Sequence, residues 1–391
     1  MEKKSTTRGP RTTHAGTKKG PKGTNELTGS SRYRAAAQSR ITHLRIRGTD
    51  EQIELPSIAS YTIGRQPAND DPTEPRADVR LPSPRKGMSL VHARFEWRKD
   101  LLWCEDAGST NGTHADYETK HDWFQVTSGM RIDFGDASVL AMDWRLTKMI
   151  EPLAWCLGLD AHEKIDRALG LVQKDGPLLL IGPRDSDQEW LARQIHEASR
   201  RRGQPFVAFT TKLGKQSEHE LDAAGFGTVF VDVSQVGKVT ASFAKKLFAG
   251  EGLQLKLRPI VTSVTHAESQ RAFQQLGQGH TLAMPDVASR GQEILRMMDR
   301  LMMEAGSPVR VRDLGEPWMC RLAAHRFATL EEVREAEKRL RAWLETRNRT
   351  HAAERVGLSR QAFTQYMRRL LGDYLEQVDE LEGKRKLKAE R

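Results

Sequence analysis

The stretch Asp106-Ala107-Gly108-Ser109-Thr110-Asn111-Gly112-Thr113 is a polar turn with two glycines, and short alternating apolar runs lie on both sides of it. Gly, Pro, Asp and Asn separate these runs, as turns separate the strands of an antiparallel sheet. The runs are Leu44/Ile46, Ile53/Leu55, Tyr61/Ile63, Val79/Leu81, Ala93/Phe95/Trp97, Leu101/Trp103, Ile132/Phe134 and Val139/Ala141. This pattern predicts a β-sandwich over residues 41–148.

Three further features accompany this turn in a fixed order. They are Gly64-Arg65 after a strand, Ser89-Leu90-Val91-His92 before another strand, and Gly129 followed by Ile132-Asp133-Phe134-Gly135. Each is weak by itself, since Asn-Gly is a generic hairpin turn. Together, in this order and on this strand pattern, they resemble the forkhead-associated (FHA) domain over about residues 41–147. The resemblance implies that loops at one end of the sandwich recognise phosphothreonine.

The chemistry of a phosphate group fits the residue types in these loops. A phosphate carries nearly two negative charges and three acceptor oxygens, so it calls for a guanidinium fork and neutral donors. The resemblance assigns Arg65 and Ser89 to the phosphate and Asn111 to the peptide backbone beside it, while His92 would brace the loop. The implied phosphopeptide-binding residues are Arg65, Lys86, Ser89, Ser109, Thr110 and Asn111. Leu90 departs from the Arg that is common in this family, and the segment 67–84 is unusually long.

After about Lys148 the apolar periodicity becomes helical, and Leu178–Ile181 and Thr228–Val233 predict buried parallel strands of an α/β layer over residues 155–287. The strand, loop and helix around Gly182 are followed by Ile195-His196, Ser199-Arg200 and Pro205-Phe206-Val207. This frame resembles the AAA+ module of sigma-54-dependent transcription activators. The alternative is a coincidental α/β segment.

The residues that a nucleotide would need are changed in this frame. A P-loop uses glycines to bring backbone N–H groups to the phosphates and a Lys to meet their charge. Gln188 stands at the Lys position, the flanking glycine positions hold Asp185 and Asp187, and Val233 replaces the catalytic Glu after Asp232. A carboxylate 4 Å from a phosphate costs about 4 kcal/mol near a surface. The degenerate site, with Gly182, Asp185, Asp187, Gln188 and Asp232, is expected to be inactive, and the loop that engages sigma-54 is absent.

The carboxyl-terminal part is predicted to be all-α, with a helical remnant of the AAA+ lid at 288–328. Leu330–Trp343 is amphipathic, with Val333, Ala336, Leu340 and Trp343 on one side. In residues 348–370, two short helices meet at Gly357, and Ser359 can cap the second helix. Their expected core is Ala353, Val356, Leu358, Phe363, Met367 and Leu370.

This layout predicts a helix-turn-helix. Residues 329–372 resemble the Fis-type DNA-binding motif that ends sigma-54 activators, and Asn348, Thr350 and Arg360 match that motif. The resemblance implies that the helix at 330–346 pairs two chains on double-stranded DNA. The expected DNA-binding residues are Asn348, Thr350, Ser359, Arg360, Gln361, Thr364, Gln365 and Arg368. The alternative is a helical hairpin that serves protein contacts.

Composition and charge narrow the function further. The chain has 391 residues and a net charge of +10, of which residues 1–40 contribute +8; residues 338–369 hold a second basic island of +7. The Thr-rich segment 1–40 has too few apolar side chains to fold and is expected to be a disordered tail, and 373–391 is a mixed-charge tail. No run approaches the roughly 18 apolar residues of a membrane span. Cys104, Cys156 and Cys320 lack metal or redox spacing, which favours a reduced, cytoplasmic setting.

The sequence therefore predicts a bacterial, phosphothreonine-responsive DNA-binding regulator that acts by site occupancy, with no catalytic residues, metal site or cofactor. Its expected partners are a phosphothreonine protein or its own tail phosphorylated by a Ser/Thr kinase, double-stranded DNA, and a second copy of the chain. The rival interpretation is a phospho-dependent scaffold whose helical end serves dimerisation.

Overall fold

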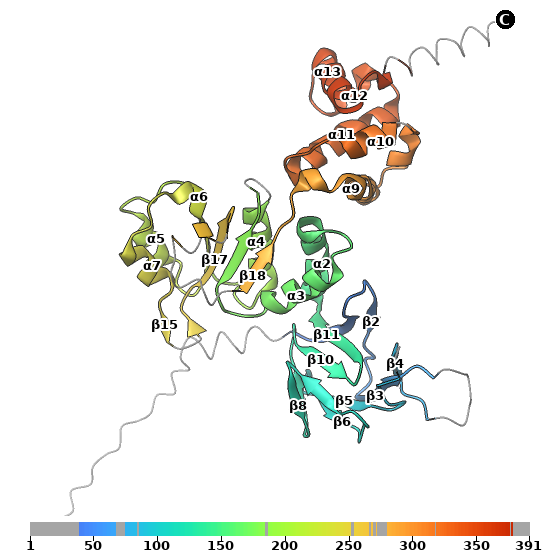
Figure 1. The fold of residues 1–391 in the computed structure, drawn as a ribbon, viewed down its shortest axis with the longest axis vertical. Helices are drawn as coiled ribbons and strands as arrows, with labels where there is room; N and C mark the ends of the chain where they lie inside the picture. The colour runs from blue at the N-terminus through green and yellow to red at the C-terminus, as the bar shows by residue number, and fades with distance from the viewer. Residues whose placement is uncertain are drawn as a thin grey trace, which may run out of the picture.

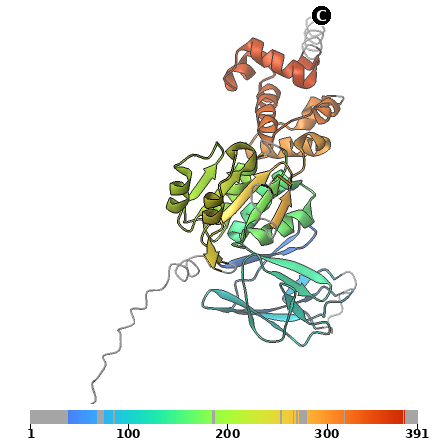
Figure 2. The ribbon, with the colours of Figure 1, turned by 60° about the vertical axis from the view of Figure 1, so that its left-hand side comes forward.

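The computed structural model describes residues 39–67, 75–83, 86–183, 187–251, 254–265, 267–268, 271, 280–316, 318–375 and 377. Residues 1–38 of the predicted tail 1–40, most of the predicted tail 373–391, residues 68–74 and 84 of the segment 67–84, Arg85 and Asp185 lie outside these residues. The described parts follow one another in space as in the sequence: a sandwich, an α/β layer and a helical part (Figures 1 and 2).

The predicted β-sandwich is present between Ile41 and Asp143. One sheet has the order β2 (Gln52–Glu54), β1 (Ile41–Ile46), β11 (Ala137–Asp143), β10 (Arg131–Phe134), β7 (Thr113–Ala115) and β8 (Glu118–Lys120). The other has the order β4 (Val79–Leu81), β3 (Ser60–Arg65), β5 (Ala93–Arg98), β6 (Leu101–Asp106) and β9 (Phe124–Val126). The inward positions of the alternating runs form the core, which includes Leu44, Ile63, Phe95, Ile132 and Phe134. Period-2 alternation thus buries one face of each sheet.

The α/β layer contains a five-stranded, all-parallel sheet in the order β13 (Phe206–Phe209), β14 (Thr228–Asp232), β17 (Arg258–Ser263), β12 (Leu178–Ile181) and β18 (His280–Ala283). Both strands that the apolar runs predicted are present and parallel, and β17 lies between them. The helices of this layer are α2 (Trp144–Leu157), α3 (His162–Val172), α4 (Gln188–Ala198), α5 (Ser217–Ala223), α6 (Val233–Val236) and α7 (Ala241–Leu247). A short hairpin, β15 (Gly250–Glu251) and β16 (Gln254–Leu255), follows α7.

The sandwich is fused to the α/β layer. Strand β11 runs directly into α2, whose first turn is capped by the carboxylate of Asp143. Leu140 and Met142 of β11 belong to the same buried apolar cluster as α2 and α3. Beside them, the guanidinium Nε of Arg45, 1% exposed, lies 2.7 Å from the carboxylate of Asp166 in α3. The two parts therefore share a packed interface with a buried ion pair.

The remaining chain is helical: α9 (Gly291–Glu304), α10 (Trp318–Ala324), α11 (Leu330–Thr346), α12 (Arg349–Arg355) and α13 (Arg360–Leu371), with short 3₁₀ turns at Val287–Ser289 and Val311–Leu314. The predicted apolar stripe of α11 is buried inside this chain, within the cluster that also includes residues of α9, α12 and α13. The pairing of two chains through the helix at 330–346 stays a prediction, and it cannot use this stripe, because its side chains are already covered within the chain. Among the described residues, no helix is long and apolar enough to cross a membrane.

Candidate functional site

The loops at one end of the sandwich bring Arg65, Ser89 and the turn after β6 together. Arg65 ends β3, and its backbone N–H donates to the carbonyl of Ser89 at 2.8 Å. Its side-chain Nε donates to the carbonyl of Met88 at 3.2 Å, which fixes the guanidinium, and among the described residues its two terminal nitrogens have no partner and can meet a ligand. A Cβ on Gly64 would lie 1.9 Å from the carbonyl oxygen of Leu90, so only glycine permits this close approach of the two segments.

Ser89 is held in place by its neighbours on both sides. Its hydroxyl oxygen accepts from the backbone N–H of Thr110 at 3.2 Å, so its proton remains available to donate. Its own N–H donates to Nδ1 of His92 at 3.1 Å, and Nε2 of His92 lies 3.0 Å from the carbonyl of Gly112. These partners assign the proton to Nε2, and burial lowers the pKa of His92, which favours the neutral ring. His92 thus braces the loop, as expected.

Asp106 organises the polar turn, a role that the sequence interpretation missed. Its carboxylate accepts from the N–H groups of Gly108 and Ser109 at 2.9 and 2.8 Å, and from the hydroxyls of Ser109 and Thr113 at 2.7 and 2.8 Å. Burial acts to raise its pKa, but these hydrogen bonds hold the pKa of Asp106 below its ordinary value. The signal for this role was an Asp two residues before Gly and three before Ser.

The structure shows how Ser109 and Asn111 are held in the turn. The hydroxyl of Ser109 donates to Asp106 and accepts from the N–H of Gly112 at 2.9 Å, so it supports the turn, and its predicted contact with a phosphopeptide stays a prediction. Asn111 is exposed, and its amide donates to the carbonyl of Gly87 at 2.6 Å, which joins the turn to the loop before Ser89. Thr110 and Lys86 are exposed at the rim.

The described residues at the loop after β12 provide little for a phosphate. The amide of Gln188 donates to the carbonyl of Pro183 at 2.6 Å, and Asp187 takes a left-handed backbone conformation with φ of 63°. The carboxylate of Asp232 accepts from the N–H of Ser234 at 2.9 Å and caps α6. Asp187, Glu189 and Asp232 line a cleft of about 620 Å³, in which Arg193 is paired with Glu189 at 2.7 Å. Three carboxylates disfavour a polyphosphate there.

A side chain from the helical part contacts the end of this loop. The guanidinium of Arg334, in α11, lies 3.5 Å from the carboxylate of Asp187 and 5.0 Å from the ring centre of Trp190 in α4. Burial raises the pKa of Asp187, while Arg334 acts in the opposite direction. The pair therefore links α11 to the amino-terminal end of α4.

Helices α12 and α13 form a compact pair joined by a short turn. Gly357 has φ of 69°, which suits glycine, and the hydroxyl of Ser359 caps α13 by accepting from the N–H of Ala362 at 3.2 Å. The expected core is present: Ala353, Phe363, Met367 and Leu370 are buried, and Val356 and Leu358 pack against them.

Three of the expected DNA-binding side chains also have structural roles within the chain. The carboxamide of Asn348 caps α12 by accepting from the N–H groups of Thr350 and His351, Ser359 caps α13, and the hydroxyl of Thr364 donates to the carbonyl of Arg360 at 2.8 Å. The exposed residues among those predicted are Asn348, Thr350, Ser359, Arg360, Gln361, Gln365 and Arg368. Polar and basic groups therefore form the outer side of α13.

Comparisons with known proteins bear on the sandwich. A family model described as FHA domain matches residues 61–135, which include Arg65, Ser89 and Asn111. The FHA domain of the CT664 protein from Chlamydia trachomatis is 23% identical over 27% of this chain and 99% of that chain, with a TM-score of 0.23. EmbR from Mycobacterium tuberculosis, in complex with a low-affinity phosphopeptide, is 22% identical over 28% of this chain and 26% of that chain, with a TM-score of 0.22.

A further solved structure covers more of the chain. NtrX from Brucella abortus, in complex with ATP, is 17% identical over 58% of this chain and 67% of that chain, with a TM-score of 0.34. No curated protein matches the chain.

Proposed function

We propose that this chain, whose residues 61–135 form an FHA domain, is a phosphothreonine-responsive DNA-binding regulator. The observation that carries the proposal is the preformed pair of Arg65 and Ser89. The guanidinium is fixed at Nε by Met88, and the serine hydroxyl is held by Thr110 with its proton free. A guanidinium fork and a neutral donor side by side match the acceptor oxygens of a phosphate group.

The DNA-binding half of the proposal rests on α13. Its outer side carries Arg360, Gln361, Gln365 and Arg368, while Phe363 and Met367 are buried beneath it. Gln side chains can read base edges in the major groove, and Arg can contact both bases and phosphates. The turn at Gly357 and the capped start of α13 fit a helix-turn-helix whose second helix enters that groove.

The α/β layer serves, in this proposal, as a degenerate AAA+ spacer without nucleotide chemistry. The parallel sheet and the loop after β12 provide the frame, but Asp187, Gln188 and Asp232 are engaged within the chain. The pair of Asp187 and Arg334 fixes α11 to α4 where a nucleotide would otherwise lie. The regulator then acts by occupying its DNA site and not by remodelling polymerase.

A dimer on a symmetric DNA site remains part of the proposal, but its contact has to use a surface other than the buried stripe of α11. The phosphothreonine ligand is proposed to be a partner protein or the chain's own Thr-rich segment 1–40 after phosphorylation by a Ser/Thr kinase. The rival function, a phospho-dependent scaffold, needs no DNA binding and is tested by the same DNA experiment.

The phosphopeptide half is tested by binding of a phosphothreonine peptide library to the full chain, compared with Arg65→Ala. Charge-assisted hydrogen bonds contribute about 1.5–3 kcal/mol each, so we expect Arg65→Ala to weaken binding by about tenfold or more. Arg94→Ala, an exposed Arg on β5, is the matched control and should bind as the wild type does. Equal binding of phosphorylated and unphosphorylated peptides, or an unaffected Arg65→Ala variant, would refute this half.

A further inference from the structure

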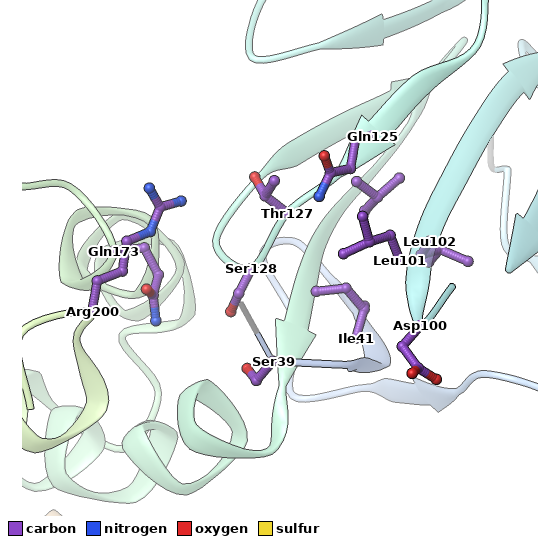
Figure 3. A pocket seen from close by; sticks show the side chains of 11 residues that line it. Ser39, Ile41, Asp100, Leu101, Leu102, Gln125, Thr127, Ser128, Gln173 and Arg200 are labelled. Carbon is purple, nitrogen blue, oxygen red and sulfur yellow. The ribbon is translucent and has the colours of Figure 1, made fainter. Parts of the chain in front are cut away.

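A cavity of about 230 Å³ lies where the sandwich meets the α/β layer (Figure 3). It is at the opposite end of the sandwich from Arg65 and Ser89. Ser89 lies before the first residue of β5, whereas Asp100 follows its last residue, and Ser128 lies before the first residue of β10. Its wall is formed by Ser39, Ile41, Asp100, Leu101, Leu102, Gln125, Val126, Thr127, Ser128, Gln173 and Arg200. It is therefore distinct from the phosphothreonine loops.

One half of this cavity presents hydrogen-bond donors that lack acceptors. Figure 3 places Arg200 and Gln173 on one side, with Thr127 and Ser128 facing them across the gap. Arg200 is half-buried, and within the described part of the chain its guanidinium has neither an ion pair nor a hydrogen bond. The hydroxyl of Thr127 has no partner there either. Ser128 accepts from the N–H of Asp143 at 3.4 Å, so its proton is free to donate.

The charge of this half favours an anion, because Arg200 is the one charged side chain among the described residues that line it, and the carboxylate of Asp100 lies on the other side. The neighbouring carboxylate of Asp143 is already engaged in capping α2 and in a contact with the hydroxyl of Ser39.

The other half of the cavity is apolar. Ile41, Leu101 and Leu102 line it, and Asp100 supplies the sole carboxylate among the described residues of the wall. Figure 3 shows Asp100 on the side away from Arg200. Since a water molecule takes about 30 Å³ in the liquid, the cavity has room for a phosphate group with a small organic substituent.

We propose that this cavity binds a small phosphate monoester. Its phosphoryl oxygens accept from the guanidinium of Arg200 and the hydroxyls of Thr127 and Ser128, and its organic part packs on Ile41 and Leu101. A planar guanidinium and two hydroxyls match the tetrahedral set of acceptors on a phosphate. This site does not depend on the proposed function of Arg65, and a ligand here would contact both the sandwich and the α/β layer.

The test measures calorimetric binding to the full-length Arg65→Ala variant, which lacks the guanidinium proposed to bind phosphate at the other site. The probes are inorganic phosphate, glycerol phosphate and O-phospho-threonine at constant ionic strength, and they separate a free phosphate from a phosphorylated metabolite or a phosphorylated side chain. We expect one saturable site that prefers a monoester over inorganic phosphate. Adding Arg200→Ala should weaken binding by about tenfold or more.

Two further variants make the result decisive. Arg200→Lys keeps the charge without the fork and should bind at an intermediate level, whereas Arg94→Ala should leave binding unchanged. If Arg200→Ala fails to fold, the pair Thr127→Val and Ser128→Ala tests the same site from its opposite wall. Absence of saturable binding in the Arg65→Ala variant, or equal binding with and without Arg200, would overturn the proposal while leaving the phosphothreonine site intact.

Discussion

Removing the carboxylate of Asp166 tests whether the sandwich and the α/β layer behave as one folded unit. That carboxylate accepts from Nε of Arg45 at 2.7 Å and from the backbone N–H of Gly48 at 2.7 Å. Arg45 is 1% exposed, so Asp166→Ala leaves a buried guanidinium without its counter-charge, and His162, 3.5 Å from its Nη2, cannot replace an anion. Breaking a buried pair in this way costs about 3–5 kcal/mol.

The assay is urea-induced unfolding followed by tryptophan fluorescence, which reports from both parts because Trp97 and Trp103 lie in the sandwich and Trp155 and Trp190 in the α/β layer. We expect Asp166→Ala to lower the free energy of unfolding of both parts together by about 3–5 kcal/mol. The double variant Arg45→Met with Asp166→Leu, which removes both charges, should recover most of that loss. A loss below about 1 kcal/mol, or a loss confined to one part, would refute the reasoning.

Three further predictions concern single contacts. Gly64→Ala forces a Cβ to within 1.9 Å of the carbonyl oxygen of Leu90, so it should abolish phosphopeptide binding while α12 and α13 stay folded, as measured by calorimetry and circular dichroism. Burial lowers the pKa of His92, so the stability contributed by its neutral ring is present above its ordinary pKa of 6.5 and is lost as the pH falls below it. The urea midpoint of the wild type should therefore fall between pH 7.5 and 5.5 by more than that of His92→Gln, and parallel midpoints would contradict this. Arg334→Ala removes the ion pair with Asp187 and the contact with Trp190, so hydrogen exchange should become faster at the start of α11 and of α4. The control Lys338→Ala, whose partner Glu335 lies on the same helix, should leave exchange in α4 unchanged.

The sandwich and its loops were predictable because their determinants are local. Period-2 alternation locates the strands, and Gly64, Ser89 and the turn after Asp106 are recognisable by order. The role of Ser109 in the turn was not predictable from the sequence, because a hydroxyl in a polar turn can face either a ligand or the turn itself. The competing acceptor, Asp106, decides between them.

Contacts between distant segments were the part that the sequence could not supply. Strand β17 begins with Arg258 and Pro259, which do not resemble a buried strand, and Arg258 is buried because it donates to the carbonyls of Leu171 and Val172 at 2.8 Å. The apolar stripe on α11 was recognisable in the sequence. The sequence does not show, however, whether the same chain or a second chain covers such a stripe. Here the same chain covers it.

Binding of the purified chain to fragmented genomic DNA, with wild type beside Arg360→Ala across a salt series, tests the central claim most directly. The account predicts a few enriched sequences that fade in the variant, and a log affinity that falls by about 0.9 per phosphate contact for each log unit of salt. Glu354→Gln, exposed on α12, serves as the surface control and should retain the same sequences. Uniform weak binding that is equal in the wild type and Arg360→Ala would contradict the regulator and favour the scaffold.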